Sequence, residues 1–488
     1  MICRSWREVA LSTPALWNGI HVFLPRFLPR YSSSSDYIST ITRKKEGLKR
    51  WLERSGSLPL TIWIAILFPS DLLVAVDDRQ LTEDVGILED VLRLIATYSR
   101  KWRSITFLAD RRRRSLAIWK PIAELQKEDL PQLQEIHAFN CLSTFSSVGQ
   151  QPPVVPSPIA SLVTSSDSLR TLDVLNVHSI STFLDLQIRW TSLKELTLRS
   201  GDQIDPSFVT SKVAALCPSL VSFNLGLASS SASSTPQPSF AVQWPHLQKF
   251  DLTIHDRNRD HLNKRLSNAF WRVFHSMTAP ALTHLSLEAQ IDRMGSELGQ
   301  GQAAEPTEPI SHLPFENMIS KSGCTLSHLS LSGVFLMSEA ALTSALHLLP
   351  SLTSLTLTDC TNSVPASHAP MGCDPDIPHH KLTSCLVSIS SSPNLCPDIA
   401  ELSISGCYVE NIESIVSFAK ARSHKLKRLS VNFGVITGER VEVIKQFMSP
   451  ADLHDLREER GIKVDWKWKE WNPKDGKIPV FDRPYTIM

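Results

Sequence analysis

Glycine is scarce in this sequence, with 18 glycines among 488 residues. Loops that cradle phosphate groups depend on glycine, and the chain contains no Gly-x-x-x-x-Gly-Lys or Gly-x-Gly-x-x-Gly motif. The Gly-x-Ser-x-Gly and His-Glu-x-x-His motifs of hydrolases and metalloproteases are also absent. We therefore expect a protein that is not an enzyme, with no cofactor and no catalytic, cofactor-binding or metal-binding residues.

An excess of either charge is also missing, since 50 Lys and Arg residues stand against 49 Asp and Glu residues. The whole chain therefore has no electrostatic attraction for nucleic acid or an anionic membrane, and neither is an expected partner. The apolar stretch from Leu58 to Phe68 is shorter than the roughly 20 residues that span a bilayer. The first residues are unlike a signal peptide, and nine cysteines, an odd number, are typical of reduced thiols. We expect an intracellular protein of the cytoplasm or nucleus.

One short pattern recurs along the chain: an apolar residue, two variable residues, an apolar residue, one variable residue and a third apolar residue. We call each copy an apolar triplet. The eleven triplets are Trp102-Ile105-Phe107, Leu133-Ile136-Ala138, Leu169-Leu172-Val174, Leu193-Leu196-Leu198, Leu220-Phe223-Leu225, Leu247-Phe250-Leu252, Leu282-Leu285-Leu287, Leu326-Leu329-Leu331, Leu352-Leu355-Leu357, Ile399-Leu402-Ile404 and Leu426-Leu429-Val431. Their first positions lie 24 to 47 residues apart. Leucine-rich repeats have periods of about 20–29 residues, so the longer gaps require insertions.

The triplet predicts a strand, because its last two apolar residues are two apart and point to the same face. A single repeat cannot bury that face, but a stack of repeats can. Proline recurs two residues before the triplet, where it ends a preceding helix and starts an extended segment. The six prolines are Pro131, Pro218, Pro245, Pro280, Pro350 and Pro397. Segments 211–216 and 340–349 have helical spacing just before such a proline. The expected fold is α/β, a leucine-rich-repeat solenoid with a parallel sheet on one face and helices on the other.

Several further positions bear on this interpretation. Cysteines at one phase after the strand match the family pattern, and we expect them to pack in a buried turn rather than to act in redox chemistry; they are Cys141, Cys360 and Cys407. Segments 150–158, 229–239, 295–309 and 361–378 are polar or proline-rich, and we interpret them as loops inserted into the array. Val464, Trp466 and Trp468 alternate like a final edge strand, with a nucleic-acid site as the minority alternative.

One group of residues could suit zinc, which prefers Cys and His ligands. The group comprises Cys373, His379, His380 and Cys385. It lacks the close Cys-x-x-Cys pairs of structural zinc sites, so the favoured interpretation is a polar loop that leads into a helix.

The first residues, Ile2-Cys3-Arg4-Ser5-Trp6-Arg7-Glu8-Val9-Ala10 followed by Leu16-Trp17, carry a family signature. They resemble the C-terminal half of an F-box, with its Val-Cys-x-x-Trp-x-x-Leu-Ala pattern and a later Leu-Trp. By helical spacing Ile2, Trp6, Val9 and Ala10 share one face, and Leu16 and Trp17 are expected to cap a small helical core. The resemblance implies a surface for a Skp-type adaptor protein, formed by Ile2, Cys3, Trp6, Leu16 and Trp17.

A second segment, from Leu48 to Leu60, is similar to the Leu-x-Arg-Ser-Gly-x-x-Pro-Leu junction between F-box and repeats in fungal F-box proteins of the mushroom type. It suggests a partial F-box over 1–22, a linker and connecting helix over 23–57, the irregular solenoid over 58–466 and a tail over 467–488. A complete F-box has about 45 residues and begins with helices that precede this half, so we expect weak adaptor binding by the chain as it stands.

These observations imply a protein-binding scaffold, the substrate-recognition subunit of an SCF-type ubiquitin ligase. In that role the repeats hold an unknown target protein and the F-box tethers it to the ligase. One alternative is a repeat-only interaction scaffold that has lost adaptor binding. An enzyme hidden in the insertions is the remaining and least favoured alternative.

Overall fold

The structure is a computed structural model of the 488-residue chain. It describes residues 3–25, 34–67, 78–109, 118–139, 158–177, 179–228, 241–256, 262–291, 315–332, 339–358, 386–387, 389, 391–392, 394–405, 412–437 and 455–471. The chain divides into two compact units, unit 1 (Met1–Ile204 and Phe208–Leu227) and unit 2 (Asp205–Ser207 and Ala228–Met488). Across these described ranges the fold is α/β, with eleven α-helices and a large parallel sheet of fourteen strands.

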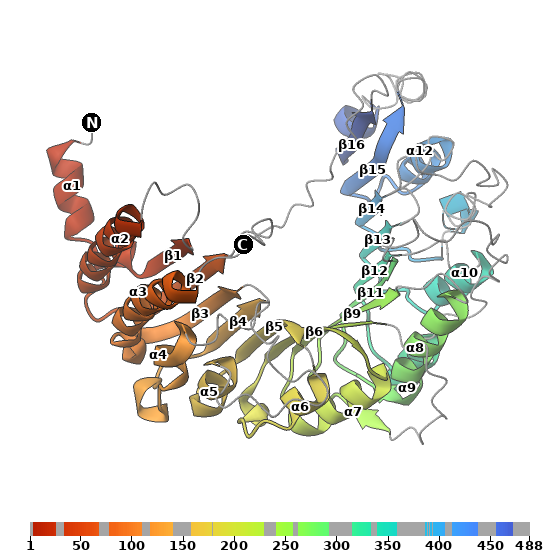
Figure 1. The fold of residues 1–488 in the computed structure, drawn as a ribbon. Coiled ribbons are helices and arrows are strands. Elements are labelled where there is room, and N and C mark those ends of the chain that lie inside the picture. Colours follow the sequence, from red (N-terminus) through yellow and green to blue (C-terminus); the bar gives the residue numbers. More distant parts are fainter. Residues whose placement is uncertain are drawn as a thin grey trace, which may run out of the picture. The chain divides into compact units, whose positions relative to one another are not determined.

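Unit 1 contains seven parallel strands that follow one another in chain order. They are β1 (Gly19–Pro25), β2 (Leu60–Leu67), β3 (Trp102–Ala109), β4 (Glu135–Phe139), β5 (Thr171–Val177), β6 (Glu195–Gln203) and β7 (Ser222–Ala228). The helices are α1 (Arg4–Leu11), α2 (Ser34–Arg54), α3 (Asp78–Ala96), α4 (Lys120–Ala123), α5 (Pro158–Ser165), α6 (Ile180–Leu184) and α7 (Pro206–Leu216). Helices α2 to α7 lie along one face of the sheet (Figure 1). We call the opposite face, which no described helix covers, the open face of unit 1.

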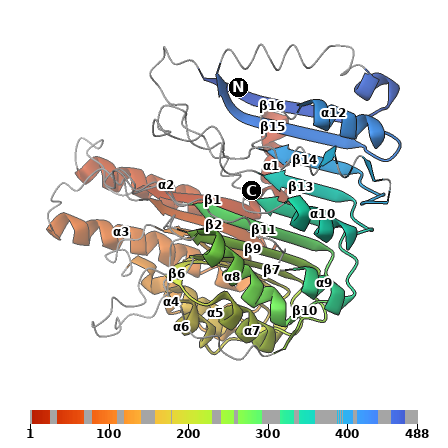
Figure 2. The same cartoon turned by 90° about the vertical axis from the view of Figure 1, so that its right-hand side faces the viewer.

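Unit 2 repeats this plan with β9 (Lys249–Asp256), β11 (His284–Ile291), β12 (His328–Ser332), β13 (Ser354–Thr358), β14 (Glu401–Ser405), β15 (Arg428–Thr437) and β16 (Lys463–Trp471). These strands run side by side in chain order (Figure 2). Helices α8 (Leu262–Ser276), α9 (Glu316–Ser322), α10 (Glu339–His347) and α12 (Ile412–Ala421) lie along one face, and the other is the open face of unit 2. Two short strands, β8 (Val242–Gln243) and β10 (Met277–Thr278), form a separate two-stranded parallel sheet.

All eleven apolar triplets are strands, or lead directly into strands, and their side chains form the core. Each of the 33 side chains is at most 3% exposed. The triplets also pair with one another in register, as in the row Phe250, Leu285, Leu329, Leu355 and Leu402 across five strands. Full burial stabilises each large apolar side chain by about 1.5–3 kcal/mol, so the repeating triplet is the main source of core stability.

Many of the described strands are tied to the strand before them by a shared carbonyl at their N-terminal end. The Gln134 carbonyl accepts from the backbone N–H groups of Arg170 and Thr171, at 2.8 and 3.0 Å. The Thr283 carbonyl accepts in the same way from Ser327 and His328, at 2.9 and 3.0 Å. The same two-to-one bond occurs at eight strand-to-strand steps among the described residues. At these eight steps one residue position thus sets the register of a strand against its neighbour.

The six recurring prolines stand where the sequence predicts, in the turn that enters a strand. The residue before each proline is also buried, a regularity that the sequence pattern did not indicate. These six residues are Leu130, Cys217, Trp244, Ala279, Leu349 and Cys396. They extend the repeating motif to apolar-Pro-x-apolar-x-x-apolar-x-apolar. The predicted helices before two of the prolines are present as α7 and α10.

The N-terminal segment requires a correction, because the predicted small helical core is not formed. No residue of α1 or of the following 3-10 turn η1 (Pro14–Trp17) is buried. Leu16 is 57% exposed, whereas Trp17 turns toward α2. The physical reason is that none of the described helices packs along the apolar stripe of α1, so the stripe faces solvent.

The parallel sheet also begins before residue 58, where the sequence pattern predicts the repeats to start. Strand β1 pairs in parallel with β2, from Gly19 opposite Thr61 to Pro25 opposite Leu67. At the other end the predicted edge strand is present as β16, which runs to Trp471. The predicted loop segments 229–239, 295–309 and 361–378 lie outside the described residues, as do residues 150–157.

Candidate protein-interaction surfaces

The first candidate surface is the exposed apolar stripe of the N-terminal helix. Trp6 and Val9 lie three residues apart on α1, hence on one side of the helix, and are 72% and 55% exposed. Leu11 and Leu16, at 40% and 57% exposed, continue the apolar character into η1. We call these four residues the N-terminal patch. Single exposed apolar residues are ordinary, but several on one short helix mark an interaction site.

Trp17 fastens this segment to the repeats. Its indole Nε1 donates to the Ala10 carbonyl at 2.8 Å, and the Trp51 Nε1 of α2 donates to the Trp17 carbonyl at 2.9 Å. The two indole rings meet edge to face with centroids 4.7 Å apart. The Arg54 guanidinium lies 4.8 Å from the centre of the Trp17 ring. The end of α1 is therefore anchored while its apolar stripe remains exposed.

The five residues predicted to bind the adaptor differ in their exposure and contacts. Trp6 and Leu16 are exposed, and Trp17 is half-buried as the anchor. Cys3 is exposed, and the pKa of its thiol is lowered by a hydrogen bond with the Ser5 hydroxyl. Ile2 lies outside the described residues.

The second candidate surface is the open face of unit 1, whose outward side chains are partly aromatic. Phe23, Ala65, Leu108, Phe139 and Leu175 occupy one register row across strands β1 to β5. Phe23 is 45% exposed, and the Leu108, Phe139 and Leu175 side chains are half-buried. We call this row the apolar row of unit 1.

A polar row runs beside the apolar row. Trp63, Thr106, His137, Asp173 and Thr197 pair across strands β2 to β6. The Trp63 ring is 5.4 Å from that of His21 on β1. The His137 Nδ1 atom is 3.6 Å from an Asp173 carboxylate oxygen, and both side chains are about one quarter exposed. Aromatic residues are enriched at protein–protein interfaces, and the two rows contain Phe23, Phe139 and Trp63, so this face is a candidate binding surface.

The open face of unit 2 is built mainly from hydroxyl side chains. One register row contains Ser286, Ser330, Thr356, Ser403 and Ser430. These side chains are all half-buried. The same row ends at Asp251 on β9 and Asp465 on β16, so it is polar throughout.

Charged and imidazole side chains lie at the N-terminal edge of the same face. Lys249 pairs with Asp251 at 3.1 Å on β9. His284 and His328 stack, with ring centroids 4.0 Å apart. Partial burial, then the neighbouring His328 and Lys249, lower the pKa of His284, while Asp251 opposes this shift. His284 is therefore held toward its neutral form.

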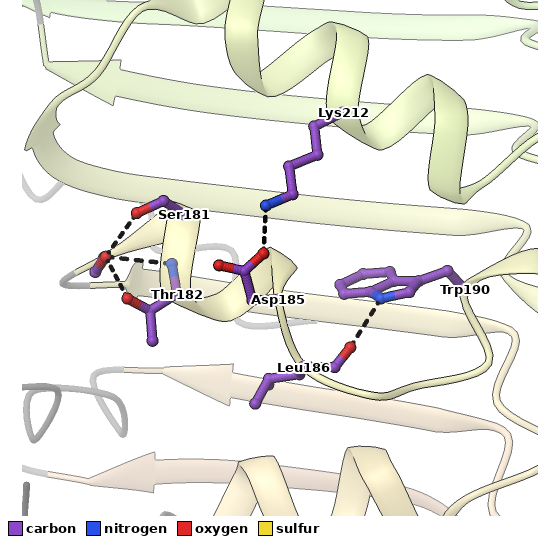
Figure 3. Close-up of polar contacts among 7 residues, drawn as sticks. Ser181, Thr182, Asp185, Leu186, Trp190 and Lys212 are labelled. Carbon is purple, nitrogen blue, oxygen red and sulfur yellow. Dashed lines mark hydrogen bonds and ion pairs between the residues drawn. The ribbon is translucent and has the colours of Figure 1, made fainter.

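On the helical face of unit 1, polar contacts around α6 have a packing role (Figure 3). The Ser179 hydroxyl accepts from the Thr182 N–H at 3.4 Å and caps α6, and Lys212 of α7 pairs with Asp185 at 2.6 Å. The Trp190 indole donates to the Leu186 carbonyl at 3.2 Å. The hydrogen bonds in this cluster lie within α6 and its flanking turn, and the ion pair links that turn to α7, so the cluster positions α6 and α7.

A cavity of about 310 Å³ lies between the helices of unit 1. Its lining includes Arg93 and Arg100 together with Glu124 and Asp129. Mixed charges and an open mouth contrast with the mostly apolar lining of small-molecule sites, and we assign it no ligand.

Other candidates from the sequence fall outside the described residues. These are the zinc candidates Cys373, His379, His380 and Cys385 and the turn cysteines Cys141, Cys360 and Cys407. Within the described ranges, no group of three or more His, Cys, Asp or Glu residues is arranged to hold a metal ion. Within those ranges, too, the helices fall short of the length and apolar character that a membrane span requires.

Comparison of the sequence with protein-family models found no match, and comparison with curated proteins found none either.

Proposed function

We propose that this chain is an irregular leucine-rich-repeat solenoid that serves as a protein-binding scaffold, the substrate-recognition subunit of an SCF-type ubiquitin ligase. The repeat interpretation is supported by the in-register triplets, the recurring apolar-Pro turn and the shared carbonyl at eight steps. A stack in which each strand contacts only its neighbours is the defining property of a solenoid.

The single observation that carries the ligase proposal is the N-terminal patch. In the resemblance to an F-box, the segment from Ile2 to Trp17 would contact the adaptor. Trp6 and Val9 project from α1 into solvent, while Trp17 anchors the segment to α2. A helix held at one end of a scaffold, with its apolar side exposed, is suited to docking against a second protein.

The mechanism is one of proximity rather than of chemistry by this chain. The repeats hold a target protein, and the N-terminal segment holds the adaptor, so the target remains close to the ligase. Tethering raises the effective concentration of the target at the ligase without a catalytic residue on the scaffold. The open faces of the two units are the surfaces we assign to the target.

The test is a titration of purified Skp-type adaptor against two proteins, the chain from Met1 and the same chain with a complete F-box upstream. We expect weak binding by the first and tight binding by the second, because the helices of the complete box order the N-terminal patch before binding. Equal and tight binding by both would show that the half-box is sufficient. No binding by either would refute the ligase role.

Variants separate the patch from general stickiness. In the protein with a complete box, Trp6→Ala is expected to weaken adaptor binding by about tenfold or more, as truncation of a buried interface tryptophan does. Trp271→Ala on α8 is the matched control, since Trp271 is also exposed, at 51%. An equal loss in both variants would contradict the proposal.

A second candidate is a repeat scaffold without adaptor binding, and one observation favours it. No residue of α1 is buried, so the N-terminal patch has no packing partner among the described residues. A segment that must order on binding loses affinity to that ordering. Under this alternative, Trp6→Ala leaves both stability and partner binding unchanged.

A further inference from the structure

The apolar row of unit 1 has a cation at each end. On β6 the row continues to Arg199, an exposed residue that is the register partner of Leu175. At the other end, Lys44 of α2 donates to the Phe23 carbonyl at 3.3 Å, and its ammonium group lies 5.8 Å from the centre of the Phe23 ring. The row therefore runs from one positive charge, across apolar side chains, to another.

A glycine on the next strand holds Arg199 against the sheet. Gly226 on β7 is buried, and a Cβ atom at this position would lie 2.9 Å from the Arg199 Cγ and 3.4 Å from its Cδ. Any larger residue there would push the arginine stem aside. Because glycine allows this close approach, the aliphatic part of Arg199 packs on β7 while the side chain stays exposed.

Neither cation is neutralised by a carboxylate within the part of the chain that the structure describes. Arg199 and Lys44 form no ion pair with a described residue. Asp173, two residues before Leu175 on β5, lies beside the His137 imidazole instead, at 3.6 Å. Covering the apolar row would exclude water, and charge-assisted hydrogen bonds to the two cations become stronger as water is excluded.

From this charge pattern we propose that the open face of unit 1 binds a segment of the target protein in which apolar side chains lie between two acidic residues. The inference rests on the proposed scaffold role and adds the chemistry of the target. The apolar side chains of the segment cover Phe23, Leu108 and Phe139, and its carboxylates pair with Arg199 and Lys44. Aromatic and arginine side chains are the residues most enriched where binding energy is concentrated.

The width of the row sets the length of the bound segment. Neighbouring strands lie about 4.8 Å apart, so β1 and β6, which are five steps apart in the sheet, are separated by about 24 Å. A helix covers this distance with about 16 residues and an extended chain with about seven. A peptide of about 16 residues is therefore long enough in either conformation.

The two ends of the row suit carboxylates better than phosphates. A phosphorylated side chain carries a charge of about −1.5 to −2 and is typically recognised by a cluster of arginines. Here the register partner of Arg199 is the apolar Leu175, and Lys44 stands at the opposite end of the row. Each end thus supplies one positive charge, which a single carboxylate neutralises.

The test is selection of a display library of random peptides of about 16 residues on the full chain, followed by titration of the enriched peptides by fluorescence anisotropy. We expect enrichment of apolar residues flanked by aspartate or glutamate. Arg199→Glu is expected to weaken the binding of such a peptide by about tenfold or more. Replacing the facing acid of the peptide by lysine should restore the affinity for this variant, since the charges are then exchanged.

Two further variants separate position from net charge. Gly226→Ala keeps the charge of Arg199 but displaces its stem, so we expect a smaller loss of affinity than from Arg199→Glu. Arg189→Glu is the matched control, because Arg189 is exposed in the connection between α6 and β6 rather than on a strand. The control is expected to bind the peptide with unchanged affinity. Circular dichroism melts check that each variant folds.

Three results would overturn the proposal. One is enrichment of peptides without acidic residues, and another is equal affinity of Arg199→Glu and Arg189→Glu for the enriched peptide. The third is tighter binding when phosphoserine replaces the acid that faces Arg199, which would assign this cation to phosphate. In each case a peptide still binds the chain, so the scaffold role stands, and the adaptor titration tests the ligase role independently.

Discussion

The open faces of unit 1 and unit 2 stand on the same parallel strand plan but carry different side chains. Unit 1 presents the apolar row with Phe23, Leu108 and Phe139, beside the His137–Asp173 pair. Unit 2 presents rows of serine and threonine with the stacked His284–His328 pair. The triplets are buried in both units, whereas the alternate strand positions differ between the two. The two faces are therefore expected to bind different chemistry.

The largest expected effect on stability comes from a substitution in a buried triplet, a feature that both units share. Leu402→Asp places a carboxylate where the leucine side chain is 1% exposed, between Leu355 and Leu429 in register. We expect a loss of about 4 kcal/mol or more in the free energy of unfolding. Because neighbouring repeats share the interface, faster hydrogen exchange should extend into β13 and β15.

The matched control is Ser403→Asp, the next residue on the same strand. Ser403 faces the open side and is half-buried, so an aspartate can remain hydrated there. A change below about 1 kcal/mol is expected in chemical denaturation. Similar losses for both variants would contradict the assigned alternation of faces.

A smaller loss is expected from removing a buried cation of unit 2. The Arg422 side chain is 4% exposed, and its Nη2 donates to the carbonyls of Ile389, Ser392 and Leu395 at 2.7 to 2.8 Å. Arg422→Met keeps the bulk but removes these donors, and we expect about 3 kcal/mol of destabilisation in urea denaturation.

Lys425→Met is the control for Arg422. Lys425 forms an exposed ion pair with Asp398 at 2.9 Å, and such surface pairs contribute about 0–1 kcal/mol. Comparable losses from the two variants would mean that the three carbonyls find water when the guanidinium is removed.

Binding of a hydrophobic dye tests whether the open face of unit 1 is more apolar than that of unit 2. The substitutions are expected to have little effect on stability. Phe23→Ser combined with Leu108→Ser should lower the fluorescence of a bound hydrophobic dye, because both side chains belong to the apolar row of unit 1. Ser332→Leu combined with Thr358→Leu in unit 2 should raise it, since these positions are paired on the hydroxyl face. Unchanged fluorescence in both variants would show that the apolar row is not accessible to a small apolar ligand.

The smallest expected effect is on the alkylation of cysteine thiols. Each unit contains a buried cysteine, so labelling reports on each unit separately. Burial raises the pKa of Cys217 in unit 1 and of Cys396 in unit 2 to about 12. Alkylation requires the thiolate, so both thiols should resist iodoacetamide at pH 8, whereas exposed Cys3, with a lowered pKa, reacts first.

In increasing denaturant, peptide mass spectrometry then reports when Cys217 and Cys396 become labelled. Simultaneous labelling would indicate that the units unfold together, and separate labelling that they unfold in turn. Rapid labelling of either thiol in the absence of denaturant would contradict its burial.

The core was predictable because the last two apolar residues of each triplet must lie on the same face of a strand. Residues such as Leu196 and Leu329 are identified by a period of two that any strand must satisfy. Strand β1 carried the same signal in Ile20, Val22 and Leu24, which are all buried. It was missed because no proline precedes it and because it follows the segment that resembles an F-box.

The surfaces were harder to predict, since they depend on contacts between distant residues. The expected core around Trp6 and Leu16 failed because a helical stripe is buried only where a partner helix exists. The His284–His328 pair requires the register of two strands, although the repeated Leu-x-His-Leu could have indicated it. The contacts of Trp17 with Trp51 and Arg54 anchor the segment to α2, whereas its contact with an adaptor stays a prediction.

The carbonyls shared at eight strand-to-strand steps fix the register of those strands at the end where they begin. Between the recurring proline and the triplet the residue count is constant, whereas the distance from one triplet to the next varies from 24 to 47 residues. A residue inserted between Pro350 and Leu355 would shift a strand past the Ser327 carbonyl and turn its apolar side outward. An insertion after Thr358, beyond the end of β13, leaves the register of this strand unchanged. Anyone grafting a tag, a label or a new binding loop onto this scaffold should therefore place it where the strands end and leave the side where they begin untouched.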